Sequence, residues 1–239
     1  MNKFLLVLCL ILAINCKKEE VTTSSFTDSR DGKVYKIVKI GNQWWMAENL
    51  CATKYRNGDD IGTTSPTDKS IKGEVNPKYQ WAYDGIESNV TSYGRLYTWD
   101  AVTDTRGLSP EGWHIPTDAE WKMLEIALGM NPLSIDSVFT RKGTNEGSKL
   151  AGNAGLWQNG KLNSDKSFGE SNFNGLPGGY RNTDGSFYLK GESEWWWSAT
   201  SDQNSGKAVI RVLQYFYSVI LWSENEKESG IAVRCVKDQ

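Results

Sequence analysis

One short stretch combines the end of a strand, a turn and the start of a helix: Gly112-Trp113-His114-Ile115-Pro116-Thr117-Asp118-Ala119-Glu120-Trp121. Pro116 disfavours helix at the residue before it. Thr117 and Glu120, three positions apart, form a capping box, in which each side chain binds the other residue's backbone N–H. The pattern therefore predicts a helix that begins near Asp118. Apolar residues recur at helical spacing as far as Leu128, so one face of this helix should be buried.

The first residues have the pattern of an export signal. Lys3 precedes an apolar run over 4–14, which is too short to span a membrane because a spanning helix takes about 20 apolar residues. The run ends at Cys16, which occupies the place of the acylated cysteine of a bacterial lipoprotein, although Asn15 replaces the usual small residue. We expect residues 1–15 to be a lipoprotein signal peptide and Cys16 to carry the lipid. An ordinary secretory signal cleaved elsewhere is the alternative.

The rest of the chain divides into a tether and one domain. Residues 16–30 are rich in Ser, Thr and charged side chains and lack a hydrophobic period, so we expect a tether there. The charged run at 17–20 resembles the surface-export signal of some Bacteroidetes lipoproteins, which favours a position in the outer membrane, exposed on the cell surface. Residues 31–239 are enough for one sizeable core. A formal net charge of −2 gives no reason to expect nucleic acid as a partner.

The composition favours short strands and turns around an aromatic core, since the chain contains 11 Trp, 10 Tyr and 23 Gly. A hairpin is predicted over 33–46, with its turn at Gly41-Asn42. Residues 194–200 should form a strand in which Trp195 and Trp197 share one face and Trp196 points to the other. Residues 207–222 form either one long strand or a strand that folds back. Long polar loops are expected at 54–78 and 153–174, and a last strand at 231–236.

Two of the four cysteines remain available to the folded domain. Cys9 leaves with the signal peptide and Cys16 carries the lipid, which leaves Cys51 and Cys235. Outside the cytoplasm such a pair is expected to be oxidised, and a bridge between them would close most of the domain into one loop. Two buried free thiols are the alternative.

Six blocks of sequence, in order, carry a family resemblance: Trp44-Trp45-Met46-Ala47-Glu48-Asn49-Leu50, Tyr93-Gly94-Arg95-Leu96-Tyr97-Thr98-Trp99, the stretch from Gly112 to Trp121, Leu176-Pro177-Gly178-Gly179-Tyr180-Arg181, Trp196-Trp197-Ser198-Ala199-Thr200 and Val233-Arg234-Cys235-Val236. Together they resemble the Fibrobacter succinogenes major paralogous domain (FISUMP), over about Asp31 to Asp238. Members look like secreted or lipid-anchored bacterial surface proteins without an assigned reaction.

The FISUMP family in turn resembles the C-type lectin-like and formylglycine-generating-enzyme fold. That resemblance implies an α+β domain with two helices, small antiparallel sheets and paired ends, which would bring Cys51 and Cys235 near one another. We therefore expect a Cys51–Cys235 disulfide. The sequence departs from the family pattern at Gln80 and Ser109, where many members have Cys. The two absences fit the loss of one disulfide.

No set of catalytic residues stands out. His114 is the only histidine, so the chain contains no histidine cluster for zinc, and a Cys–His or Ser–His pair would need this one residue. The formylglycine-generating relatives use an active-site cysteine pair, for which only Cys51 and Cys235 are available. Glu192 and Glu194 could serve as paired carboxylates on a glycoside, although same-face spacing in a strand is common. We expect no cofactor and no enzymatic activity.

Calcium-dependent sugar binding is not indicated, because the Glu-Pro-Asn, Gln-Pro-Asp and Trp-Asn-Asp motifs of calcium lectins do not occur. Oxygen-bearing side chains in the second polar loop could hold a hard cation, or could simply be solvated: Asp165, Glu170, Asn172 and Asn174. Whether this chain binds a metal stays open at this point.

Exposed aromatic rings can stack on sugar rings, while neighbouring amides and carboxylates bind the hydroxyls. The candidates are Trp157, Trp195, Tyr215, Tyr217 and Trp222, and for each of them core packing is the alternative. We predict a lipid-anchored surface recognition or adhesion module that binds glycans, such as a polysaccharide, or another surface protein. An enzyme, either an oxidase of the formylglycine-generating kind or a carbohydrate-active hydrolase, is one alternative. A structural envelope protein is another.

Overall fold

The computed structural model describes residues 21–136 and 143–239, so the predicted signal peptide and Cys16 lie outside the described residues. Its largest sheet has five strands in the order β1-β2-β3-β12-β6. Their bounds are β1 Thr23–Thr27, β2 Val34–Ile40, β3 Gln43–Met46, β6 Trp113–His114 and β12 Val236–Lys237. All pairings are antiparallel, and β12 lies between β3 and β6. The ends of the domain therefore meet in one sheet, as the family resemblance implied.

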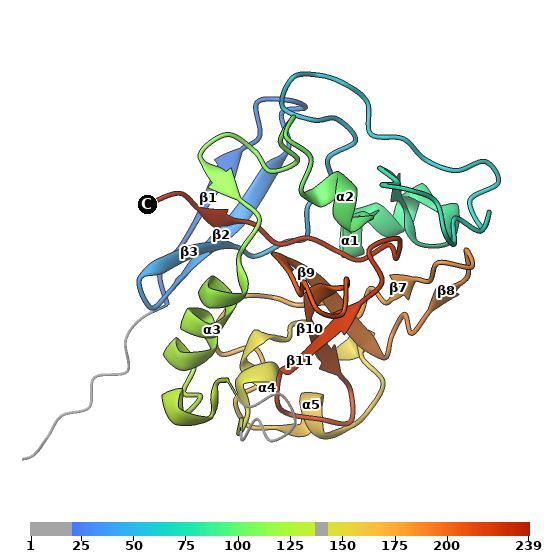
Figure 1. Cartoon of the computed structure of the whole chain (residues 1–239). Helices are drawn as coiled ribbons and strands as arrows, with labels where there is room; N and C mark the ends of the chain where they lie inside the picture. Colours follow the sequence, from blue (N-terminus) through green and yellow to red (C-terminus); the bar gives the residue numbers. More distant parts are fainter. Residues whose placement is uncertain (1–20, 137–142) are drawn as a thin grey trace, which may run out of the picture.

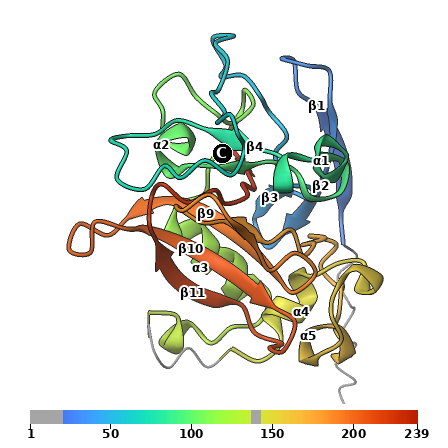
Figure 2. The ribbon, with the colours of Figure 1, turned by 90° about the vertical axis from the view of Figure 1, so that its right-hand side faces the viewer.

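A second antiparallel sheet contains β9 (Ser193–Ser201), β10 (Ala208–Gln214) and β11 (Leu221–Asn225), with β10 in the middle. The predicted strand at 194–200 is thus confirmed, and the segment 207–222 folds back. Helix α3 (Asp118–Ala127) lies along one face of this sheet (Figure 2). It begins at Asp118, in agreement with the predicted start near this residue, and the capping box between Thr117 and Glu120 is present.

The remaining elements are short. Two sheets of two strands each pair β4 (Gln80–Trp81) with β5 (Leu96–Tyr97) and β7 (Tyr180–Arg181) with β8 (Phe187–Tyr188). The short α-helices are α1 (Val90–Tyr93), α2 (Trp99–Val102), α4 (Glu146–Leu150) and α5 (Lys161–Ser164). The 3-10 turns are η1 (Tyr83–Gly85), η2 (Glu87–Asn89), η3 (Pro132–Ser134) and η4 (Ala154–Leu156). Figure 1 shows these short elements around the two larger sheets and α3.

Two hydrophobic clusters lie on opposite faces of β2 and of β9. Val38 of β2 joins the first cluster, together with Trp121 of α3 and Trp196 of β9. Tyr35 of β2 joins the second, together with Trp197 of β9. The opposite orientation predicted for neighbouring tryptophans in this strand is confirmed. Hydrophobic clusters therefore pack against both faces of β2 and of β9. With a few helices and small antiparallel sheets, the molecule is α+β.

Strand β1 corrects the expected tether. Residues 16–30 were predicted to form one, but Thr23–Thr27 pair with β2 at the edge of the large sheet. The strand has mostly exposed Ser and Thr, so it shows no hydrophobic period. Its one large side chain, Phe26, stacks between Tyr35 and Trp113, with ring centroids 5.5 and 4.5 Å away. A single inward aromatic residue is enough to place this edge strand.

The helix content also differs from expectation. In place of two helices, the described residues contain one helix of ten residues and four of four or five. The predicted 33–46 hairpin and the long 54–78 loop are confirmed. Arg181 fixes this loop: its buried guanidinium donates to the Thr67 carbonyl (3.0 Å) and the Lys69 carbonyl and lies 4.1 Å from the Trp81 ring. Among residues 21–136 and 143–239, none of the helices has the length and apolarity needed to traverse a bilayer.

Candidate functional site

A buried polar network is centred on Asn49, just after β3. Its Nδ2 donates to the Tyr93 carbonyl (2.8 Å) and to Glu194 Oε1 (2.7 Å). Its Oδ1 accepts from Trp196 Nε1 (2.9 Å) and from Arg234 Nε (2.6 Å). An amide side chain offers two donor hydrogens and two acceptor positions, and Asn49 uses all four. We call these five residues the Asn49 hub.

Glu194 is the acidic member of the hub and is fully buried. Its Oε2 accepts the backbone N–H of Gly178 at 2.7 Å, so both carboxyl oxygens are bound inside the protein. Burial raises the pKa of Glu194 to about 8, against the opposing effects of the Asn49 and Gly178 hydrogen bonds and of the Arg234 charge. The geometry places this carboxyl in the core, out of reach of a substrate, and gives no support to a carboxylate pair with Glu192.

Arg234 ties the hub to the end of the second polar loop. Its guanidinium donates to the carbonyls of Met46 (3.1 Å), Phe173 and Asn174 (2.9 Å), and it lies 4.5 Å from the Phe173 ring centroid. Burial lowers the pKa of Arg234 to about 10, and the charge of Glu194 opposes this shift. Arg234 therefore stays charged at neutral pH and fixes the backbone at 173–174.

The six sequence blocks of the family resemblance meet at this hub. Five of them supply Asn49, Tyr93, Gly178, Trp196 and Arg234 to its hydrogen bonds. The block at the start of α3 supplies the Trp121 ring, whose centroid lies 5.7 Å from that of Trp196. A structural role in the core therefore accounts for these six sequence blocks.

Gly94 lies so close to the hub that a side chain cannot be placed there. Its φ is +72°, and a Cβ atom at this position would lie 2.5 Å from the Asn49 Cβ. Glycine is the residue that tolerates both the left-handed backbone and this close approach. Packing against Asn49 thus explains why glycine follows Tyr93.

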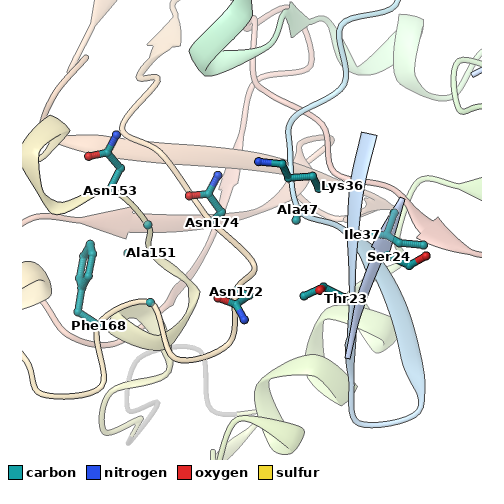
Figure 3. A pocket seen from close by; sticks show the side chains of 12 residues that line it. Thr23, Ser24, Lys36, Ile37, Ala47, Ala151, Asn153, Phe168, Asn172 and Asn174 are labelled. Atoms are coloured by element: carbon teal, nitrogen blue, oxygen red, sulfur yellow. The ribbon is translucent and has the colours of Figure 1, made fainter. Parts of the chain in front are cut away.

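A pocket of about 770 Å³ opens between the β1–β2 edge of the large sheet and the second polar loop (Figure 3). Its polar lining consists of Thr23, Ser24, Lys36, Asn153, Asn172 and Asn174. Phe168 contributes an aromatic ring on the side of Asn153, and the two hydroxyl residues lie on the opposite side. We call this cavity the amide pocket. Its volume suits a small ligand or a few sugar units.

The three asparagines of the amide pocket share a backbone geometry. Asn153, Asn172 and Asn174 have φ values of 48°, 55° and 56°, in the left-handed region where asparagine is enriched. A parallel bridge between Ala151 and Gly175 sets Asn153 close to Asn174. Within the described residues, none of the three side-chain amides makes a hydrogen bond, in contrast to Asn49. Their donors and acceptors are available to a ligand.

A smaller pocket of about 220 Å³ adjoins the first, since Asn174 lines both. Lys33, Glu48, Cys51 and Arg234 are also part of its lining. Glu48 is fixed there by the backbone N–H of Lys36, which donates to its Oε2 at 2.8 Å. The smaller pocket thus holds charges of both signs.

The cysteine prediction needs correction, because the structure has Cys51 and Cys235 as free thiols and the expected bridge is not formed in it. Cys235 is fully buried, which raises the pKa of its thiol to about 12. Cys51 lies half-buried beside the smaller pocket, where its backbone N–H donates to the Tyr35 hydroxyl at 3.0 Å and its Sγ lies 3.5 Å from the Asn49 carbonyl oxygen. Each thiol has its own packing environment.

The five aromatic candidates do not form one site, and none of them lines either pocket. Trp157 is buried and its Nε1 donates to the Gly152 carbonyl at 3.0 Å, so it supports the loop that carries Asn153. Trp195 and Trp222 are half-buried. Trp195 pairs with Val212 of β10 and Trp222 pairs with Arg211, so the two rings lie on different faces of the three-stranded sheet.

Two of the remaining candidate rings have a defined side-chain partner. Trp195 stacks on Tyr180 with centroids 4.3 Å apart, and Trp222 donates to Asp118 Oδ1 at 3.0 Å. Tyr215 is half-buried, and Tyr217, which is 43% exposed, lies in the turn between β10 and β11. These rings cap the ends and edges of the second sheet.

His114 lies between two carboxylates. Its Nδ1 and Nε2 are each 2.6 Å from an oxygen, of Asp238 and of Glu120 respectively. Burial lowers the pKa of His114, but the hydrogen bonds to Asp238 and Glu120 outweigh it, so the pKa is raised above 6.5. The histidine therefore joins the C-terminal end of the chain to the start of α3.

The proposed cation ligands are only partly brought together. Asn172 and Asn174 line the amide pocket, whereas the Asp165 carboxylate accepts the backbone N–H of Ser167 at 2.8 Å. In the part of the chain that the structure describes, no three His, Cys, Asp or Glu side chains are grouped so as to hold a metal ion.

Only part of the amide pocket could be predicted from the sequence. The polar loop and two of its asparagines were identified, but Lys36, Asn153 and Phe168 were not. Lys36 belongs to a strand more than a hundred residues away, and no local pattern shows that this strand faces the loop.

Comparison with known proteins identifies the family. The model of the Fibrobacter succinogenes major domain matches residues 38–237, which include all six sequence blocks and most of the described fold. No curated protein and no solved structure is significantly similar to the chain. With the greater part of its length matched, the chain belongs to the Fibrobacter succinogenes major domain family.

Proposed function

We propose that this protein is a lipid-anchored recognition module of the bacterial cell surface and that it binds a glycan in the amide pocket. One observation carries the proposal. Three asparagine amides without a protein hydrogen-bond partner among the described residues line one cavity of about 770 Å³. Sugar hydroxyls need donors and acceptors in this kind of arrangement.

Other features of the pocket support a sugar ligand. The half-buried Phe168 ring offers an apolar surface for the C–H groups of a sugar. The hydroxyls of Thr23 and Ser24 add further hydrogen-bonding groups across the cavity (Figure 3). The family is associated with the cell surface, where glycans are abundant.

The amide pocket replaces the scattered aromatic rings as the proposed binding site. Trp157 keeps an indirect part in it, because its hydrogen bond to Gly152 holds the loop next to Asn153. Trp195, Tyr215, Tyr217 and Trp222 are not among the residues that line the cavity.

Glycan binding is tested with the purified mature protein on a glycan array, run with and without calcium. The test variants are Asn153→Gly, Asn172→Gly and Asn174→Gly, since glycine tolerates the positive φ while the side chain with its amide is removed. Asn76→Gly is the matched control, because Asn76 is exposed, has φ 51° and lies outside both pockets.

We expect binding by the wild type and the control, and at least tenfold weaker binding by the pocket variants. An array without any bound glycan would favour a structural envelope protein or a protein ligand. Turnover of a glycoside or of a cysteine peptide on the same panel would favour an enzyme.

Lipid anchoring is a separate proposal with its own measurement. Mass spectrometry of the purified protein should find an acylated Cys16 at the mature N-terminus. An unmodified N-terminus, or an uncleaved Met1, would refute the anchor without affecting the glycan proposal.

A further inference from the structure

We infer that the amide pocket takes an acidic glycan, and that the Lys36 ammonium binds a carboxylate of that glycan. The inference rests on the proposed function and narrows it to one class of ligand, glycans that contain uronic or other carboxyl-bearing sugars. Its basis is the distribution of charge around the cavity.

Among the described residues, Lys36 is the only charged one that lines the amide pocket, and no carboxylate of these residues lines it. Within the described residues the Lys36 ammonium has no acidic partner at ion-pair distance. Other lysines do have one: Lys122 Nζ lies 2.7 Å from an Asp136 oxygen, and Lys78 Nζ lies 2.8 Å from Asp104. The pocket thus contains an unneutralised positive charge.

The position of Lys36 directs this charge into the cavity. Lys36 lies on β2 opposite Ser25 of β1, and its side chain extends toward Asn174 on the far wall (Figure 3). A carboxylate between these two residues could accept from the ammonium and from the amide at once. Hydrogen bonds in which one partner is charged are stronger than those between neutral groups.

The smaller pocket provides an internal contrast. Lys33 and Arg234 line it together with Glu48, so two cations and one carboxylate face the same small space. Glu48 is held there by the Lys36 backbone N–H, which keeps the carboxylate out of the amide pocket's lining. Among the described residues, the lining of the amide pocket has a positive charge and no carboxylate, whereas an acidic ligand in the smaller pocket would face Glu48.

The loop side of the amide pocket is close to neutral. Lys161, Asp165, Lys166 and Glu170 follow one another in the 153–174 loop with two charges of each sign, and none of them lines the cavity. Selection for an acid should therefore depend on Lys36 itself.

The test uses matched probes: oligosaccharides that contain uronic acid and the same oligosaccharides after reduction of each carboxyl to a primary alcohol. Binding is measured for the mature wild type, Lys36→Ala and Lys36→Gln. Lys39→Ala is the control, because Lys39 is exposed on the same strand and lies outside both pockets.

We expect the wild type to bind the acidic form at least tenfold more tightly than the reduced form, with a preference that weakens as salt is raised. Both Lys36 variants should lose this preference through weaker binding of the acidic form alone, while the control keeps it. Unfolding curves that match the wild type show that the variants fold.

Equal binding of the acidic and reduced forms by the wild type would overturn the inference and leave the proposed function standing. Binding restricted to sulfated glycans would overturn it in the same way. Failure to bind any glycan of the array would overturn the proposed function itself, and the inference with it.

Discussion

Asparagine has two opposite roles in this protein, in the Asn49 hub and in the amide pocket. Asn49 is buried and uses all four of its hydrogen-bonding positions, whereas Asn153, Asn172 and Asn174 use none within the described residues. The same amide thus specifies the core in one region and stays available in the other. The saturated network indicates a structural role, and unpaired polar groups around a cavity indicate a binding role.

Asn174 lies at the boundary between the two regions. Its backbone carbonyl accepts from Arg234 of the hub at 2.9 Å, while its side chain lines the amide pocket. The pocket wall is therefore fixed by the core through its backbone. Four predictions test how sharply the two roles are separated.

The largest effect is expected for Asn49→Ala. This change leaves the buried Trp196 indole N–H and the Arg234 Nε–H without an acceptor. It also removes the hydrogen bond that Asn49 Nδ2 donates to Glu194. We expect a loss of roughly 3–5 kcal/mol in the free energy of unfolding, because uncompensated buried polar and charged groups are costly. Urea denaturation measures it.

The matched comparison for Asn49→Ala is Asn172→Gly, which should change the free energy of unfolding by less than about 0.5 kcal/mol because Asn172 is exposed. If the two variants unfold at similar urea concentrations, the division between a structural and a binding asparagine is wrong.

Glu194→Gln comes second. Asn49 Nδ2 and the Gly178 N–H both donate to this side chain, and a glutamine can accept only one of them and turns its own NH₂ toward the other. We expect a loss of roughly 1–3 kcal/mol at pH 5.

The pH dependence of the Glu194 variant follows from the raised pKa. The folded-state pKa of Glu194 is about 8, against 4.5 for an unperturbed glutamate, so its stabilising contribution is complete below pH 4.5 and is lost as the pH rises through 8. The deficit of Glu194→Gln relative to wild type should therefore shrink between pH 5 and pH 8.5. A deficit that grows over this range would show that the folded-state pKa is not raised.

His114→Gln should have a smaller effect, of about 0.5 kcal/mol, because the histidine and its partners are partly exposed and the ion pairs are screened. The pKa of His114 is raised above 6.5, so its contribution is present below pH 6.5 and lost as the pH rises through the folded-state pKa. Denaturation at pH 5.5 and pH 8.5 measures the difference. A larger loss at the higher pH would contradict the assigned protonation.

The smallest effect, none at all, is expected for added reductant. Because the structure has both cysteines as free thiols, the urea midpoint should not change, and thiol titration of the unfolded, unreduced protein should find both Cys51 and Cys235. A native bridge would contribute roughly 2–5 kcal/mol. A midpoint that falls by this much on reduction would restore the disulfide prediction.

Local sequence signals predicted the parts of the fold that local rules govern. The capping box at Thr117 and Glu120 located α3, and alternation located the tryptophans of β9. Strand β1 was missed because an edge strand of exposed Ser and Thr carries no hydrophobic period.

The Asn49 hub could not be predicted from the sequence, for a different reason. Asn49, Glu194 and Arg234 are far apart in the chain, and nothing in their local patterns pairs them. The family resemblance drew attention to the blocks that contain them but gave no reason for their recurrence. The amide pocket was equally hidden, since it needs the contact between β2 and a loop that begins more than a hundred residues later.

Strand β1 sets a limit on where a bound ligand can be held. It supplies Thr23 and Ser24 to the amide pocket and begins only seven residues after Cys16. Even a fully extended chain covers at most about 25 Å over seven residues. In the anchored protein that we propose, one wall of the pocket therefore stays within this distance of the lipid headgroups. Such a short connection suits the binding of a polymer that lies against the bilayer. A longer connection would be needed to reach material beyond a thick capsule.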